Sequence, residues 1–194
     1  MMSRENWELS YKHGHTPWDT GVSQHLQQLE KIPEGRFLDI CCGTGNDVAY
    51  LAKREFPSFG IDISLAALKQ AKEKAEKNRV KASFVLGDIL ALPFKHSSFS
   101  FVNDRGCFHH VSPGDRKAFA GELRRVMKKN GLYIMKCFCW REKSVIGPQK
   151  LRKDEIMETF SQSFVVDVKE DFMDDRFEEM RKEKTAYFCR MVRK

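Results

Sequence analysis

The sequence lacks any long apolar run. None of its apolar stretches approaches the roughly 20 residues that a helix needs to cross a bilayer, and the N-terminus lacks the apolar core of a secretory signal. The hydrophobic fraction of 41% is ordinary for a globular protein and argues against residence in a membrane. A chain of 194 residues is long enough to bury one sizeable core. We therefore expect residues 1–194 to form one cytoplasmic domain without a membrane partner.

The cysteine spacing of zinc sites is also absent. The six cysteines are Cys41, Cys42, Cys107, Cys137, Cys139 and Cys189. Neither the adjacent pair nor the Cys-x-Cys pair has zinc-finger spacing, and no histidine pair lies at a matching distance. Most of the cysteines lie in apolar runs, where a free thiol behaves as a small hydrophobic group that the cytoplasm keeps reduced. We expect six reduced thiols and no metal, with a soft-metal or arsenic site as the minor alternative.

No part of the chain carries a long run of charge of one sign. The net charge is +7, but basic and acidic residues are interleaved within 72–77 and 178–184. Such runs usually form solvated helix faces. No basic tail, zinc knuckle or RNA-binding aromatic motif accompanies them. These features argue against nucleic acid as a partner.

One stretch combines a buried strand with a glycine turn. Residues 36–46 read Arg-Phe-Leu-Asp-Ile-Cys-Cys-Gly-Thr-Gly-Asn, and the apolar positions predict a strand over 37–40. Gly43 and Gly45 allow the backbone to turn tightly and to approach a ligand closely before a helix over 47–53. A strand, a glycine turn and a helix in this order are typical of a nucleotide-type site.

Two further positions indicate the class of cofactor. Asp62 follows Gly45 by seventeen residues and ends the next apolar run, where a Rossmann-like sheet holds a ribose diol. A dinucleotide site uses a third glycine near its pyrophosphate, but Val48 stands at that position. S-adenosylmethionine has no pyrophosphate and needs only an acidic strand end, a close turn and a ribose carboxylate. The pattern therefore favours S-adenosylmethionine over a nicotinamide cofactor.

Predicted strands and helices alternate along the first 140 residues. The strands are predicted at 37–40, 58–62, 82–86, 99–103 and 132–139. The helices are predicted at 19–29, 47–53 and 65–77, and from 113 to an end at Asn130-Gly131. Next come a helix over 150–160 and two strands that can form a hairpin, 164–168 and 186–192. The pattern predicts a three-layer, doubly wound α/β fold, with a mostly parallel seven-stranded Rossmann-like sheet and one antiparallel strand near the C-terminus.

Four of the predicted strands are followed by polar residues or by a glycine turn that a ligand can approach closely. These residues are the segment from Asp39 to Gly45, the pairs Asp62-Ile63 and Asp88-Ile89, and Asp104-Arg105. Ligands in such sheets lie beyond the carboxyl ends of the strands, where the strand order reverses. We expect the Asp88 carboxylate to accept a hydrogen bond from an adenine amino group and the N–H of Ile89 to donate to a ring nitrogen.

Several of these motifs resemble those of a known family. Asp39-x-Cys41-x-Gly43-x-Gly45 resembles motif I of the class I methyltransferases, with cysteine at a position where glycine is usual. Two other motifs are similar to those of the thiopurine methyltransferase family: Glu5-Asn-Trp7-x-x-x-Tyr11-x-x-Gly14-x-Thr16-x-Trp18 and Asp104-Arg105-Gly106. The resemblance covers residues 5–139. It implies methyl transfer from S-adenosylmethionine to a small, soft nucleophile, with S-adenosylhomocysteine as product.

The resemblance also implies roles for individual side chains. Trp7 and Tyr11 would cover the methionine end of the cofactor, and Trp18 would form a wall between cofactor and acceptor. Aromatic faces suit a sulfonium cation. Arg105 would face the methionine carboxylate or an anionic acceptor through a charge-assisted contact. Packing on the outside of the core is the alternative role for the aromatic side chains.

The implied reaction is an in-line displacement at the sulfonium methyl group, in which alignment of the reactants supplies much of the rate. A soft thiolate or anion can react without a general base, and His109 and His110 are the nearest candidates for one. Two other functions stay open. An RNA or protein methyltransferase would share the cofactor half of the site, and a non-catalytic module would bind the cofactor without turnover.

Overall fold

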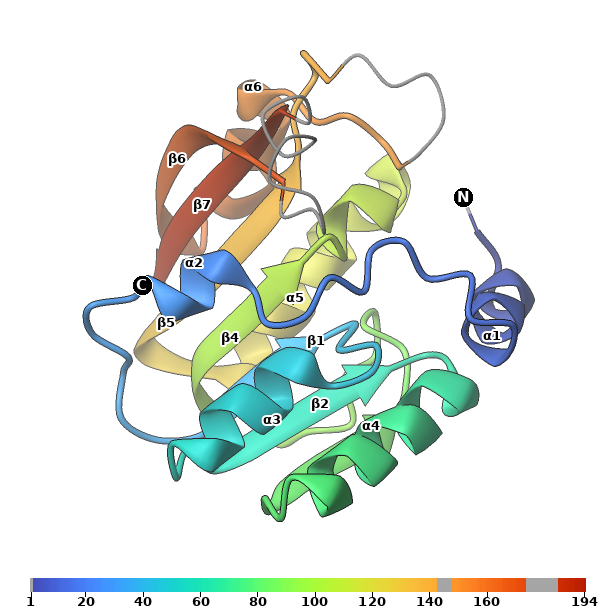
Figure 1. The fold of residues 1–194 in the computed structure, drawn as a ribbon. Coiled ribbons are helices and arrows are strands. Elements are labelled where there is room, and N and C mark those ends of the chain that lie inside the picture. Colours follow the sequence, from blue (N-terminus) through green and yellow to red (C-terminus); the bar gives the residue numbers. More distant parts are fainter. Residues whose placement is uncertain (1, 143–147, 174–184) are drawn as a thin grey trace.

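The computed structural model describes residues 2–142, 148–173 and 185–194 and is built around a seven-stranded sheet. The strands are β1 (Phe37–Ile40), β2 (Ser58–Asp62), β3 (Ala82–Leu86), β4 (Phe99–Arg105), β5 (Met127–Phe138), β6 (Phe164–Phe172) and β7 (Thr185–Arg193). They lie in the order β3-β2-β1-β4-β5-β7-β6 (Figure 1). Strands β1 to β5 pair in parallel, whereas β7 runs antiparallel to β5 and β6. The predicted mostly parallel sheet is therefore confirmed.

Helices cover both faces of this sheet. The α-helices are α1 (Arg4–Lys12), α2 (Gln24–Gln27), α3 (Asn46–Lys53), α4 (Leu65–Lys77), α5 (Arg116–Val126) and α6 (Lys153–Phe160), and the 3-10 helices are η1 (Phe108–His110) and η2 (Pro113–Asp115). Phe37 shares a buried cluster with Leu51 of α3, and its neighbour Leu38 shares another with Phe119 of α5. Successive strand side chains point to opposite faces. The alternation of β1 therefore separates two core layers, and Figure 1 shows α3 in front of the sheet and α5 behind it.

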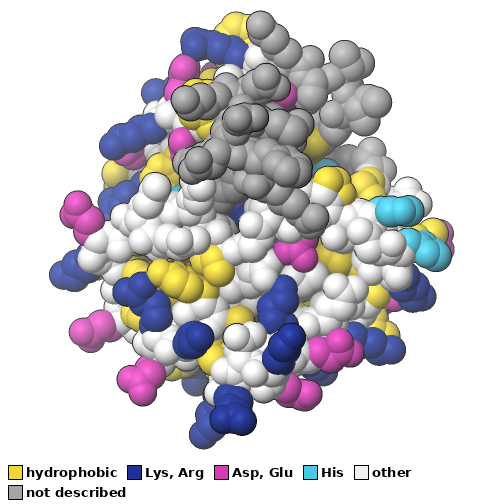
Figure 2. All heavy atoms as spheres, viewed as in Figure 1, with side chains coloured by type: hydrophobic (Ala, Val, Ile, Leu, Met, Phe, Trp, Pro, Cys, Tyr) yellow, Lys and Arg dark blue, Asp and Glu magenta, His cyan; other side chains and the backbone are white. Residues whose placement is uncertain are grey.

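Charges of both signs are spread over the visible surface. Figure 2 shows Lys and Arg side chains interspersed with Asp and Glu on the face that it displays. The charge of this face is therefore mixed, and of the two interleaved runs in the sequence, 178–184 lies outside the described residues. Across the described ranges, the helices are too short or too polar for a membrane span.

Helix α4 begins and ends where local signals predict. The Ser64 hydroxyl at its N-cap accepts a hydrogen bond from the N–H of Ala67 (3.1 Å). Leu68, Ala71 and Ala75 recur at helical spacing and are buried. The bounds predicted for this helix, 65–77, are confirmed.

The helix predicted over 19–29 is wrong in length, because only the four residues of α2 are helical. Gly21 has a φ of +91°, which interrupts the helix. The carboxylate of Asp19 accepts a hydrogen bond from the Thr44 hydroxyl (2.8 Å) in the turn after β1. A contact to a distant segment therefore overrides the amphipathic pattern.

The helix predicted to end at Asn130-Gly131 ends earlier, at Val126. Strand β5 begins at Met127, which pairs with Phe99 of β4, and Asn130 has a φ of +60°. Pairing with a neighbouring strand therefore replaces the last helical turn. Other bounds also differ from their predictions: the strand predicted over 164–168 extends to Phe172, and the helix predicted over 150–160 begins at Lys153.

Replacing Ser64 tests the contacts at the start of α4. Its hydroxyl accepts from Ala67 N–H and donates to Glu8 Oε2 (2.8 Å), which links α4 to α1. We expect Ser64→Ala to lower the free energy of unfolding by about 1–2 kcal/mol, measured by urea denaturation. The control is Ser83→Ala, an exposed serine on β3, which should stay within about 0.5 kcal/mol of wild type. Equal stabilities of the two variants would contradict this role for Ser64.

Candidate functional site

The turn after β1 uses left-handed backbone at both of its glycines. Gly43 and Gly45 have φ angles of +52° and +72°, a region that glycine enters at little steric cost. A Cβ at Gly43 would lie 2.6 Å from the Tyr11 hydroxyl, and one at Gly45 would lie 2.8 Å from the Phe84 ring. Backbone conformation and close packing therefore both require glycine here. Within the protein, Tyr11 approaches the turn closely, and the predicted approach of a ligand stays a prediction.

Asp62 lies beside this turn, at the end of β2. Its Oδ2 accepts a hydrogen bond from Gly43 N–H (2.8 Å) and its Oδ1 accepts one from Ser64 N–H (2.9 Å). The side chain is 5% exposed, and the following Ile63 is half-buried. Burial raises the pKa of Asp62, and the N–H groups of Ser64, Gly43 and Ile63 oppose that rise. A carboxylate has about four lone-pair sites, so both oxygens can also accept ribose hydroxyls.

Three N-terminal aromatic side chains, Trp7, Tyr11 and Trp18, come together next to the turn. Trp18 Nε1–H donates to the Tyr11 hydroxyl (3.1 Å), and the Trp7 and Trp18 rings meet edge-on with centroids 5.0 Å apart. The Trp7 ring also meets the His110 ring at 4.9 Å. Tyr11 is buried against Gly43, which places the group over the turn. We call the side chains of Trp7, Tyr11 and Trp18 the aromatic cover.

Glu8 attaches the aromatic cover to α4. Its Oε2 accepts hydrogen bonds from the Ser64 hydroxyl (2.8 Å) and from Ala66 N–H (3.0 Å). The N–H of Ala66, followed by the Ser64 hydroxyl, holds the pKa of Glu8 below its usual value. The sequence reasoning missed Glu8, because its role arises from the docking of α1 on α4.

Arg105 ends β4 and reaches the chain segment that carries Trp18. Its guanidinium donates to Thr20 Oγ1 (2.8 Å) and to the carbonyl oxygen of Trp18 (3.3 Å). The family resemblance assigned Arg105 and Trp18 to the same site, and the structure shows a direct hydrogen bond between them. The contact of Arg105 with a cofactor carboxylate or an anionic acceptor stays a prediction.

A buried polar network lies behind the turn. The amide of Asn103 donates to Asp39 Oδ1 (2.8 Å) and to Asp47 Oδ2 (3.1 Å), and its Oδ1 is 2.7 Å from His25 Nε2. Asp47 also accepts hydrogen bonds from the backbone N–H and the hydroxyl of Ser23. Burial, followed by the nearby Asp47, raises the pKa of Asp39 well above its ordinary value. Of this network the sequence pattern identified only Asp39, since the other four residues carry no local signal.

Asp88 and Ile89 follow β3, next to the end of β2. Asp88 is exposed, and its Oδ1 accepts a hydrogen bond from Leu90 N–H (2.8 Å) in a local turn. Ile89 is partly buried against the core. Gly87 N–H donates to the carbonyl oxygen of Asp62 (3.0 Å), which keeps the two strand ends together. The adenine contacts of this pair stay a prediction.

Cys41 and Cys107 form a disulfide, so the expectation of six reduced thiols is wrong for this pair. Their Cα atoms are 5.7 Å apart, although 66 residues separate them along the chain. Ile40 of β1 pairs with Asp104 of β4, which brings the two following loops together. The free cysteines are all buried: Cys42, Cys137, Cys139 and Cys189. In the part of the chain that the structure describes, no group of three or more His, Cys, Asp or Glu could hold a metal.

The candidate bases His109 and His110 lie in η1, beside the aromatic cover. His109 Nδ1 accepts a hydrogen bond from Phe138 N–H (3.2 Å), so its Nε2 carries the proton. Burial lowers the pKa of His109 well below its ordinary value and lowers the pKa of His110 to about 4. Both rings are therefore neutral at pH 7.

Asp104 is fully buried and holds η1 in place. Its carboxylate accepts hydrogen bonds from the N–H groups of Cys107 (2.6 Å) and Phe108 (3.1 Å) and from the Tyr133 hydroxyl (2.9 Å). Burial raises the pKa of Asp104 to about 7, although the three donors favour the ionised form. Asp104 thus positions the loop that contains Cys107 and both histidines.

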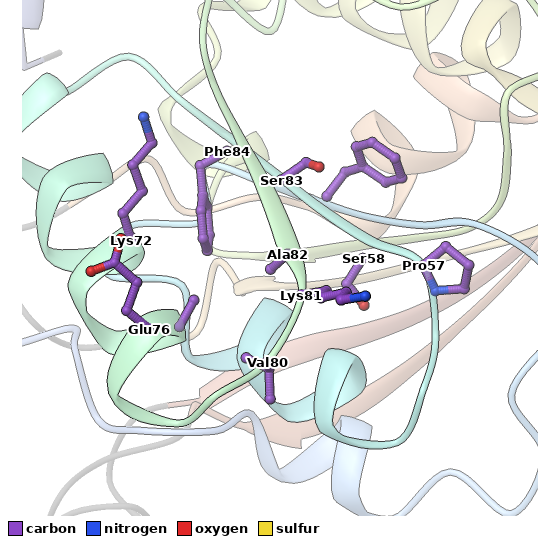
Figure 3. Close-up of a pocket in the computed structure, with 11 residues that line it drawn as sticks. Pro57, Ser58, Lys72, Glu76, Val80, Lys81, Ala82, Ser83 and Phe84 are labelled. Atoms are coloured by element: carbon purple, nitrogen blue, oxygen red, sulfur yellow. The ribbon is translucent and has the colours of Figure 1, made fainter.

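A hollow of about 390 Å³ lies away from these residues (Figure 3). Ser58 and Ala82, at the starts of β2 and β3, line it together with Lys72 and Glu76 of α4. The turn and Asp62 lie at the opposite, carboxyl ends of the strands. This hollow is therefore separate from the candidate site.

Comparison with known proteins identifies a family match and curated relatives. The family described as "Methyltransferase domain" matches residues 37–131. "Probable thiol methyltransferase 2" of Arabidopsis thaliana is 31% identical over 159 residues, which cover 79% of this chain and 70% of that protein. "Thiocyanate methyltransferase 1" of Brassica oleracea is 31% identical over 134 residues, which cover 66% of this chain and 59% of that protein.

Solved structures share the whole architecture. The structure reported as "Conversion of a Disulfide Bond into a Thioacetal Group during Echinomycin Biosynthesis" aligns with a TM-score of 0.85 at 22% identity, over 98% of this chain and 92% of that chain. A SAM-dependent methyltransferase from Methanosarcina mazei aligns with a TM-score of 0.75 at 17% identity, over 89% of this chain and 98% of that chain. At these identities, both similarities show the fold alone.

Tyr133→Phe tests the electrostatics of Asp104. The pKa of this carboxyl is about 7 in the folded protein against an ordinary 3.8, so its contribution to stability is present at low pH and is lost as the pH rises through about 7. Removing a donor to the ionised form raises that pKa further. We expect the variant to lose about 1.5–3 kcal/mol of unfolding free energy at pH 8 and less at pH 5, measured by urea denaturation.

The matched control is Tyr50→Phe, whose hydroxyl accepts from Arg54 near the surface of α3. Its effect should be small and the same at both pH values. A loss for Tyr133→Phe that does not depend on pH would contradict the role given to Asp104.

Proposed function

The chain belongs to the class I S-adenosylmethionine-dependent methyltransferases, and we propose that it methylates a thiol or another small, soft nucleophile. Two lines of support lead to this acceptor class. The relatives carry the names thiol and thiocyanate methyltransferase. The N-terminal aromatic segment and Asp104-Arg105-Gly106 resemble motifs of the thiopurine methyltransferase family, whose wider branches act on soft atoms.

The observation that carries the proposal is the aromatic cover lying against the glycine turn and Asp62. The residues present fit the cofactor. Asp62 can accept hydrogen bonds from ribose hydroxyls. Because Gly43 has no Cβ, the Tyr11 side chain can pack directly against the turn. The rings of Trp7, Tyr11 and Trp18 suit a sulfonium cation. Asp88 and Ile89 would hold the adenine, and Asp39 and Cys41 would border the methionine portion.

When bound, S-adenosylmethionine supplies a methyl group on a positively charged sulfur. The role of this chain is to orient the reactants and to exclude water. Trp7 and Trp18 would enclose the reacting centre, and Arg105 holds Trp18 through its carbonyl oxygen. Alignment of this kind is worth up to about 7–11 kcal/mol of the barrier.

We propose that the reaction uses no general base. His109 accepts a main-chain N–H on Nδ1, so its Nε2–H can only donate to a substrate. His110 packs against Trp7, and burial keeps its ring neutral. A thiol with a pKa near the working pH supplies its own thiolate. The guanidinium of Arg105 would favour such an anion over a neutral acceptor.

The alternative polymer substrates have less support. An RNA methyltransferase is expected to present a basic surface, whereas basic and acidic side chains are mixed on the face in Figure 2. An RNA acceptor would also give an affinity that falls steeply with salt.

Asp62→Ala tests the cofactor placement. Isothermal titration should show that the wild-type protein binds S-adenosylhomocysteine and not NAD. The variant should bind at least about tenfold more weakly, because a hydrogen bond to a charged carboxylate is worth about 1.5–3 kcal/mol. The matched control is Asp167→Ala, an exposed carboxylate on the edge strand β6, which should bind as wild type does. Binding of NAD, or a folded Asp62→Ala protein with unchanged affinity, would refute the placement.

His110→Gln tests the absence of a base. A panel of thiols and soft anions, assayed by S-adenosylhomocysteine release, should include an acceptor whose kcat/KM rises with its own thiol ionisation. We expect His110→Gln to retain activity within about tenfold, since a general base contributes about 10²–10⁴-fold. In both proteins, the pH at which kcat/KM is half-maximal should match the thiol pKa of the acceptor. A loss of about a thousandfold together with loss of the pH dependence would establish His110 as a base, and a protein without turnover on the whole panel would support a binding module.

A further inference from the structure

The disulfide between Cys41 and Cys107 lies at the point where the strand order reverses. From β1 the sheet continues to β2 and β3, and from β4 it continues to β5. Cys41 directly follows β1, and Cys107 follows β4 after Gly106. Ligands of doubly wound sheets bind in the crevice between two such loops. The disulfide therefore ties together the two walls of the crevice that would hold the cofactor.

The two bridged cysteines differ in exposure. Cys41 is exposed, whereas Cys107 is 2% exposed. Thiol–disulfide exchange begins when a thiolate reaches one sulfur of the bond, and the other sulfur departs. An incoming small thiol can therefore reach Cys41, with Cys107 as the leaving group. The buried free cysteine Cys42 is shielded from such attack.

We infer that Cys41 and Cys107 form a thiol–disulfide exchange site for small-molecule thiols, and that the bridged form binds the cofactor more weakly than the dithiol form. The bridge restrains the turn that carries Gly43 against the loop that carries Gly106. Cys41 itself has a φ of +50°, a left-handed backbone conformation that is uncommon for a residue other than glycine. Breaking the bridge frees the two walls to separate around a ligand.

The exchange balances with two thiols as reductant. The thiolate of the first, RS⁻, attacks Cys41 Sγ and breaks the bond to Cys107, which takes up a proton. A second RSH, as its thiolate, attacks the R sulfur of the mixed disulfide, releases Cys41 as a thiol after proton uptake, and forms RSSR. The protein gains two electrons and two protons, and the two small thiols lose them. A small disulfide drives the reverse reaction.

This site has a consequence that rests on the proposed function. If the methyl acceptor is a thiol, the same class of molecule that is methylated also reduces the bridge. An abundant thiol would then open the cofactor site, and a small disulfide would close it. The rate of methyl transfer would then rise with the concentration of the acceptor thiol, because that thiol also reduces the bridge.

The test measures S-adenosylhomocysteine binding by titration after equilibration of the full chain with reduced glutathione or with glutathione disulfide. Peptide mass mapping determines whether the Cys41–Cys107 bridge is present or reduced in each sample. We expect at least tenfold weaker binding in the bridged protein, and restored binding after reduction. The double variant Cys41→Ser/Cys107→Ser, which has neither thiol, should bind with the same affinity in both buffers. Cys189→Ala, which removes a buried free cysteine, should keep the difference.

Three outcomes would overturn the inference: equal affinities of the bridged and reduced wild-type proteins, no bridge in glutathione disulfide, or a difference that persists in the folded double variant Cys41→Ser/Cys107→Ser. The wild-type comparison decides the question even if a variant fails to fold. Asp62→Ala in reduced glutathione separates the two proposals, because its weaker binding supports the cofactor placement whatever the disulfide does. A reduced wild-type protein that binds no S-adenosylhomocysteine would overturn both.

Discussion

The hydrogen bond from Gly43 N–H to Asp62 is the contact on which the rest of the site depends. It joins the turn after β1 to the end of β2 across 19 residues of chain. Burying a carboxylate costs free energy, and the N–H groups of Gly43 and Ser64 offset that cost. Tyr11 packs against the same turn, where a Cβ would displace it. One buried carboxylate therefore fixes the turn, the start of α4 and the resting place of Tyr11.

Charged side chains at the edge of the site hold the N-terminal segment against the turn and α4. Glu8 caps the start of α4, Asp19 bonds Thr44 in the turn, and Arg105 bonds Thr20. The helix α1 has nine residues, and an isolated helix of that length is marginal in water. Its order therefore depends on these contacts and on aromatic packing.

The adjacency of β1 and β4 has two consequences for function. It places the loops after β1 and β4 side by side at the carboxyl ends of the strands, where such sheets bind ligands, and it brings Cys41 within bonding distance of Cys107. The loop of Cys107 is set by Asp104, which also places His109 and His110 beside the aromatic cover. Sulfur chemistry and methyl transfer would therefore share one structural element.

Local patterns in the sequence determined most of the fold, because strand alternation, caps and glycine turns act over a few residues. The bounds of β2, β3 and α4 match their predictions, and the predicted site residues Gly43, Asp62 and Tyr11 come together. Only the tertiary structure decided the length of α2, the role of Glu8 and the bond between Cys41 and Cys107. These features arise from contacts between segments far apart in the chain, and no periodicity or local propensity records which distant residues will meet.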